Sequence, residues 1–82
     1  MEREQILAAL AQAYDDVYRE YQILMAFGTQ LLKDGKRETY HEVEWYANGK
    51  SCLLDGIAQA AAALGIDWDE LIKRTEKEGV HP

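Results

Sequence analysis

Apolar residues between positions 7 and 31 recur at the spacing of a helix that packs against a partner. Alternating steps of three and four residues separate the members of one stripe: Leu7, Leu10, Tyr14, Val17, Tyr21, Leu24, Gly28 and Leu31. This spacing keeps one side of an α-helix facing its neighbour. The flanking positions on both sides are also largely apolar, with Glu20 as the exception. We therefore expect a helix over residues 2–34 that is covered on more than one side.

Two glycines mark this predicted helix. Gly28 lies in the apolar stripe where a large side chain is expected, which indicates close approach by another backbone. Gly35 supplies the left-handed residue that commonly ends a helix. At 1.5 Å per residue the helix would be about 45 to 50 Å long, which is far longer than a lone globule of this size needs.

The middle of the chain carries signals for two different structures. Asn48 and Gly49 form the strongest short signal for a β-hairpin, and strand-favouring residues precede them. Thr39 and Glu42 instead match a capping box at the start of a helix. A hairpin would have no further strand to extend it. We predict one helix over residues 40–64 and keep the hairpin as the alternative. Its apolar face is Val43, Tyr46, Leu53, Ile57, Ala60 and Leu64.

Small residues line another side of this second helix. Gly49 and Gly56 share that side with Trp45, Cys52 and Ala63. A glycine inside a helix costs about 1 kcal/mol relative to alanine, so two of them need a reason. We expect close packing against the first helix to be that reason. The alternative is a binding groove floored by the two glycines and walled by Trp45.

The end of the chain predicts a short third helix. Gly65 ends the second helix, and Asp67 caps the third with Glu70 completing a capping box. The third helix is expected over residues 68–78, with Gly79 ending it.

These elements predict an all-α fold in a single domain, residues 1–82. Two long antiparallel helices form a helical hairpin, and the short third helix packs against them. A chain of 82 residues hides only about 60% of the surface that its unfolded form exposes. The sequence has neither a cysteine pair nor a metal-binding cluster to stabilise so small a core, so we expect a partner subunit to supply the missing stability. We predict a homodimer that builds a four-helix-type bundle.

The charge and cysteine content narrow the function classes. Fifteen acidic and nine basic residues give a formal net charge of −6, which disfavours contact with nucleic-acid phosphates and anionic lipid. Cys52 is the only cysteine, so an internal disulfide is impossible and a reducing compartment is favoured. The first residues lack the basic start and unbroken apolar run of a signal peptide, so we expect none, and no stretch is apolar enough to span a bilayer. We expect a cytoplasmic protein without membrane contact.

Residues that could support catalysis or bind a cofactor are sparse. Ser51 is the sole serine and no base or acid can be placed beside it. Cys52 lies in a helix interior rather than at a cationic helix start, which is where reactive thiols are usually found. Glu38 and His41 give the letters of a di-iron motif once, but a cap at Thr39 would leave Glu38 outside the helix. We expect no metal, no cofactor and no enzymatic activity.

The junction of the second and third helices resembles the helix-turn-helix of the factor-for-inversion-stimulation type. The matching features are the alanines of residues 60–63, a Leu64-Gly65-Ile66 turn and a following Leu71. The resemblance implies a DNA-binding regulator. The first residues of its recognition helix would be acidic, however, and would oppose phosphate. We therefore expect no direct nucleic-acid binding. A degenerate helix-turn-helix regulator is the third functional hypothesis, after the two given below.

The same turn is similar to that of the all-helical nucleotide pyrophosphohydrolases, whose chains often end in Leu-Gly-Ile-Asp and a short acidic helix. Their magnesium site needs a Glu-x-x-Glu pair on one helix and a Glu-x-x-Asp pair on the next. Here Cys52 stands three residues before Asp55, and Glu42 is followed by Trp45. The ligands are missing where the motif requires them, so the resemblance carries no magnesium site.

The favoured functional hypothesis is a small helical module that binds other proteins and itself. Its expected contacts include the aromatic residues, because Tyr and Trp dominate interface energetics. The predicted interface is Leu10, Tyr14, Val17, Tyr18, Tyr21, Leu24, Met25, Trp45 and Tyr46. The alternative is an acidic inhibitor that imitates nucleic acid and blocks a basic groove on a partner protein. Its surface would be Asp15, Asp16, Glu42, Glu44, Asp67, Asp69 and Glu70.

Overall fold

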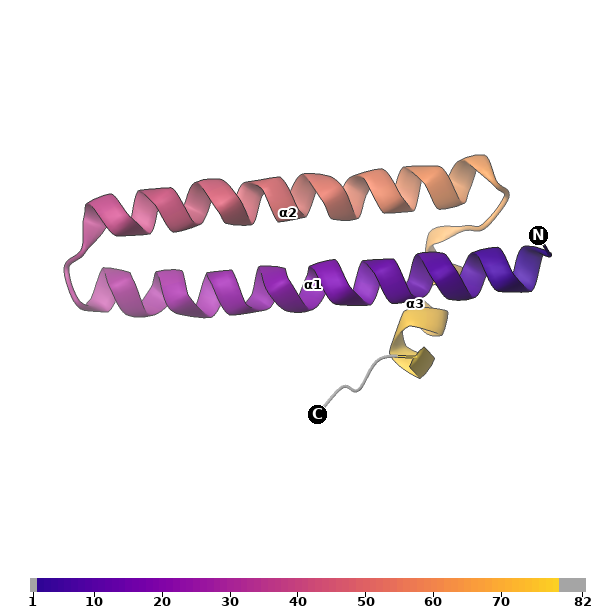
Figure 1. The fold of residues 1–82 in the computed structure, drawn as a ribbon, viewed down its shortest axis with the longest axis horizontal. Helices are drawn as coiled ribbons and strands as arrows, with labels where there is room; N and C mark the ends of the chain where they lie inside the picture. The colour runs from indigo at the N-terminus through magenta and orange to yellow at the C-terminus, as the bar shows by residue number, and fades with distance from the viewer. Residues whose placement is uncertain (1, 79–82) are drawn as a thin grey trace.

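The computed structural model describes residues 2–78, which fold into three α-helices (Figure 1). Helix α1 (Arg3–Lys33) and helix α2 (Arg37–Ala63) run antiparallel and lie side by side along their length. Helix α3 (Trp68–Glu78) packs against the N-terminal half of α1. The molecule measures 49 × 26 × 18 Å along its principal axes. The predicted all-α fold of two long helices and a short third is confirmed.

Glycine ends both long helices, as the sequence predicts. Gly35 and Gly65 have φ angles of 74° and 79°, the left-handed region that side chains with a Cβ avoid. After Gly65, the amide of Ile66 donates to the carbonyl of Ala61 at 2.9 Å, which satisfies an unpaired group of the last helical turn. After Gly35, the amide of Lys36 likewise donates to the carbonyl of Leu31 at 2.9 Å. The predicted stop at Gly79 lies outside the described residues.

Helix α2 begins three residues earlier than predicted. Lys36 occupies the N-cap position without a side-chain cap, and the amide of Tyr40 donates to its carbonyl at 3.0 Å. Thr39 therefore lies inside the helix, and the predicted capping box of Thr39 with Glu42 is wrong. The tight turn at Gly35 already reverses the chain, so α2 starts at once. The helix continues unbroken through Asn48 and Gly49, which excludes the hairpin.

The main hydrophobic core lies at one end of the hairpin. There α3 and its preceding turn cover both long helices, and the buried residues are Leu7, Ala11, Tyr14, Leu54, Ala61, Ile66 and Leu71. Towards the α1–α2 turn, the described residues form only two helices, without a third layer. Gly28 is buried there, but a Cβ atom built on it would meet the side chains of Tyr40 and Val43 at ordinary contact distances of 3.5 and 3.7 Å. The close backbone approach expected at Gly28 is therefore not observed.

The apolar face predicted for α2 differs from the observed one. The buried residues of α2 are Val43, Ala47, Leu54 and Ala61. Of the face expected from spacing, Tyr46, Leu53 and Leu64 are exposed. The inward side combines Val43 and Leu54 with two alanines, whereas Trp45, Tyr46 and Leu53 point into solvent. The largest apolar residues of α2 are consequently left in contact with solvent.

Ion pairs join the helices to one another. Arg3 makes two bonds of 2.6 Å to the carboxylate of Glu70 and one of 3.1 Å to the carbonyl of Gly65. Lys50 donates to Glu20 at 2.5 Å between the long helices. Glu20, the polar exception among the positions that flank the apolar stripe of α1, therefore pairs across the hairpin. These contacts fix α3 and α2 relative to α1.

Candidate interaction surface

Most α1 residues of the predicted interface are used within the chain. Leu10 and Val17 are partly buried against the core, and Tyr14 is buried. The Trp68 ring meets the Tyr14 ring edge-on at a centroid distance of 5.7 Å. Burial, with smaller contributions from neighbouring charges, raises the pKa of Tyr14 above its ordinary value. Tyr14 therefore offers little area to a second molecule.

The remaining members of the predicted interface divide between two surfaces. Tyr21 and Leu24 are half-buried between the long helices. Tyr18 and Met25 are exposed on α1, and Met25 lines a shallow depression between α1 and the start of α2. Trp45 and Tyr46 lie together on α2. The structure thus separates the exposed aromatic pair on α2 from the exposed residues of α1.

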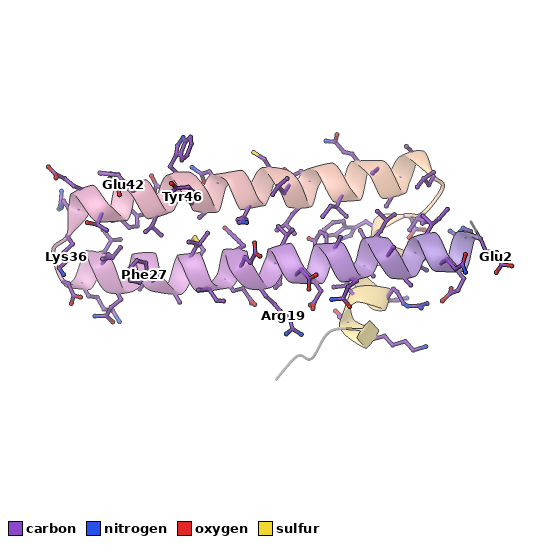
Figure 2. The ribbon with its side chains drawn as sticks, in the orientation of Figure 1. Glu2, Arg19, Phe27, Lys36, Glu42 and Tyr46 are labelled. Carbon is purple, nitrogen blue, oxygen red and sulfur yellow. The ribbon has the colours of Figure 1, made fainter. Side chains whose placement is uncertain are left out.

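The exposed side of α2 that points away from the core is here called the outward face. Trp45, Tyr46 and Leu53 on this face are 72%, 60% and 53% exposed. The rings of Trp45 and Tyr46 meet edge-on at 5.4 Å, so each restricts the other. Figure 2 shows Tyr46 on α2, well separated from α3. The full set of the outward face is Trp45, Tyr46, Gly49, Cys52, Leu53, Gly56, Ala60 and Ala63.

The two glycines of the outward face have no packing role within the described chain. A Cβ atom built on Gly49 or Gly56 would have no atom of another part of the chain within 4 Å. The expectation that they pack against the first helix is therefore wrong, because they sit on the side that α1 does not contact. A shallow recess surrounds Gly49 and is bordered by Trp45 and Leu53. The recess includes Gly49 and Trp45 but not Gly56, so only part of the alternative groove has a counterpart in the structure.

From Trp45 to Ala63 the outward face carries no charged side chain, although Glu42 lies on the same side one seven-residue step before Gly49. Between Trp45 and Leu64 the charged residues of α2 are Lys50 and Asp55. Lys50 is half-buried and bound to Glu20, and Asp55 projects from a different side of the helix. Since 29% of the whole chain is charged, an uncharged exposed face of this length stands apart from the rest of the surface.

The acidic residues of the alternative hypothesis are engaged separately. Asp15 is only 2% exposed and forms an ion pair of 2.9 Å with Arg19. Arg19 extends from the side of α1 away from α2 (Figure 2). Asp67 caps α3 by accepting the amide of Glu70 at 2.8 Å, which confirms the predicted cap. The Glu70 carboxylate binds Arg3. These three residues therefore do not form a continuous array of phosphate-like charges.

Two of the other acidic groups also bond locally. Asp16 accepts from the amide of Gln12 at 2.9 Å. Glu44 accepts the hydroxyl of Tyr40 at 2.9 Å, and this bond raises the pKa of Tyr40. Glu42 and Asp69 are exposed on α2 and α3.

Side chains that could carry chemistry are dispersed. Among residues 2–78, no three His, Cys, Asp or Glu side chains come together in a way that could hold a metal ion. His41 lies 4.0 Å from Glu44, and both are exposed. Cys52 is exposed on the outward face. The described helices include none that combines the length and apolar character needed to cross a bilayer.

The first residues of α3, where a recognition helix would contact DNA, contact α1 instead. Trp68 packs on Tyr14, and Glu70 is held by Arg3. No protein-family model, curated protein or solved structure matches this chain.

Proposed function

We propose that this chain is a protein-protein interaction module that acts by binding, without catalysis, and that self-associates through the outward face of α2. One observation carries the proposal: Trp45, Tyr46 and Leu53 are largely exposed on a helix face that has no charged residue over positions 45–63. Interface centres are enriched in aromatic residues and depleted of charged ones. The outward face has both properties.

The energetics favour covering this face. Burying a large apolar side chain contributes about 1.5 to 3 kcal/mol, and small domains have only about 5 to 15 kcal/mol of total stability. Burying three such side chains in a contact would therefore contribute a free energy comparable to the total stability of a small domain. The net charge of −6 opposes contact between two copies on most of the surface, but least on a face without carboxylates.

Light scattering at micromolar concentration tests the proposal. The chain should return at least twice its mass of 9.4 kDa. Leu53→Glu should give a folded monomer, because a carboxylate would be buried at the contact. Met25→Glu is the matched control, since Met25 is 49% exposed but lies on α1. It should self-associate like the unmodified chain.

Circular dichroism of each variant verifies that the helices are retained. A wild-type chain that stays a 9.4 kDa monomer across the range contradicts self-association. Loss of association in Met25→Glu but not in Leu53→Glu would move the contact to α1, where the sequence-based interface placed most of its residues.

A further inference from the structure

The outward face contains a second seven-residue repeat, separate from the stripe that packs inside the chain. Steps of three, four, three, four and three residues separate its members. They are Tyr46, Gly49, Leu53, Gly56, Ala60 and Ala63, and all are exposed. This spacing is typical of a helix that packs lengthwise on another helix. Within residues 2–78 no helix lies against it.

Side-chain size alternates along this exposed repeat. Tyr46 and Leu53 are large, whereas the residues that follow each of them in the repeat, Gly49 and Gly56, have no side chain. If two copies of α2 met in parallel, each large residue would face its own kind and each glycine would face a glycine. Packed interfaces avoid such alternating collisions and voids. An antiparallel pair instead sets Tyr46 over Gly56 of the second copy and Leu53 over Gly49 of the second copy.

Charge gives the same orientation. Glu42 lies one seven-residue step before Gly49, at the end of the repeat. A parallel pair would place two Glu42 carboxylates side by side in an assembly of strongly acidic chains. An antiparallel pair in the register above separates them by eighteen residues, about 27 Å at 1.5 Å per residue. That distance exceeds the screening length of about 8 Å at physiological salt.

We infer that the occupant of the outward face is α2 of a second copy of this chain, packed antiparallel with Gly49 and Gly56 at the closest approach. The inference rests on the proposed function and adds the orientation, the register and the role of the glycines. The two hairpins then form a row in which the two α2 helices are central and the two α1 helices are outer. Glycine allows the axes to approach because nothing projects between the backbones.

Thiol cross-linking tests the orientation. In the inferred register the two-fold axis passes near residue 51, so the two Cys52 side chains lie about 3 Å apart along the helix axis. A short bis-maleimide should convert the wild-type chain to a covalent dimer on a denaturing gel. Ala63→Cys in a Cys52→Ser background should give none, because its two thiols would be about 36 Å apart.

The outcomes separate the inference from the proposed function. Efficient cross-linking at position 63 would show a parallel pair and overturn the inference while self-association stands. A dimer by light scattering that cross-links at neither position places the contact elsewhere and also overturns it. A monomer by light scattering removes the proposed function itself.

Glycine replacement tests the close approach. Gly49→Ala with Gly56→Ala meets nothing within the described chain, so the monomer should melt at the same temperature or higher. The added methyl groups would overpack the inferred contact and weaken dimerisation about tenfold or more. Asn48→Ala is the control, because it also removes a poor helix former but lies off the repeat. Unchanged dimerisation in the glycine double variant would overturn the inference.

Discussion

At the scale of single residues, the helical glycines differ in what surrounds them. Gly28 is buried, and a Cβ atom built on it would meet the Tyr40 ring at 3.5 Å, an ordinary contact distance. Gly28→Ala should therefore be tolerated and should gain up to about 1 kcal/mol of stability from its helix propensity. Gly28→Leu should overpack the α1–α2 contact and lose about 1 to 3 kcal/mol. Urea unfolding followed by circular dichroism measures both. A Gly28→Leu variant as stable as wild type would contradict the observed packing.

The contact of Arg3 with Glu70 predicts a pH dependence. The hydrogen bond from Arg3 is the largest cause that lowers the pKa of Glu70, and the same bond raises the pKa of Arg3. A carboxylate whose folded pKa lies below its unfolded pKa stabilises the fold above the unfolded value. That stabilisation is lost as the pH falls through the folded value. Glu70→Gln should accordingly unfold at lower urea than wild type at neutral pH.

The difference between Glu70→Gln and wild type should shrink below about pH 4, where the unfolded carboxyl takes up its proton. Glu76→Gln on the same helix removes the same charge elsewhere and serves as the control. A Glu70→Gln effect that stays constant from neutral to acid pH would show that the carboxylate charge is not what matters.

At the scale of elements, capping signals were only partly informative. Asp67 caps α3 as predicted, but Thr39 does not cap α2. A capping box is one of several ways to begin a helix, and the tight turn at Gly35 provides another without any side-chain bond. Sequence spacing and glycine positions could therefore predict the three helices and the ends of the two long ones, but not the residue at which α2 begins.

The orientation of α2 could not be predicted for a different reason. Two apolar stripes run along this helix, and each mixes large and small residues: Val43, Ala47, Leu54 and Ala61 on one, Tyr46, Gly49, Leu53 and Gly56 on the other. Spacing alone therefore does not indicate which stripe faces α1. Only the packed structure decides between them. The exposed glycines, which sequence reasoning assigned to internal packing, are the signal that the outward stripe has another use.

Helix α3 depends on one buried side chain for much of its packing. Leu71 is 0% exposed, so Leu71→Ala should cost about 2 to 5 kcal/mol through lost burial and a residual cavity. We expect α3 to separate from α1 before the hairpin melts, because the cavity lies at their contact. Hydrogen exchange should show protection lost in residues 68–78 first. Lys73→Ala, at an exposed position of α3, should change little. Uniform loss of protection in all three helices would contradict this order.

At the scale of the whole molecule, the two proposed kinds of binding should respond oppositely to salt. Self-association through the uncharged outward face should not weaken, whereas binding of an acidic surface to a basic partner should. Each chain carries a net charge of −6, and the outward face carries none. Raising the salt from about 0.05 to 0.5 M screens repulsion between copies and should leave the dimer equally strong or stronger. Sedimentation equilibrium measures this. Association that weakens steeply with salt would instead indicate attraction between opposite charges and would contradict an uncharged contact.

The two tryptophans occupy separate surfaces, and this placement makes the molecule its own optical probe. Trp45 is 72% exposed on the outward face, whereas Trp68 is 54% exposed and rests one side of its indole on Tyr14 where α3 joins α1. In a Trp68→Phe background, the remaining indole emission shifts to the blue when a partner covers α2. In a Trp45→Phe background, it shifts to the red when α3 leaves α1. Fluorescence from one indole at a time therefore distinguishes association from local opening, with no added label.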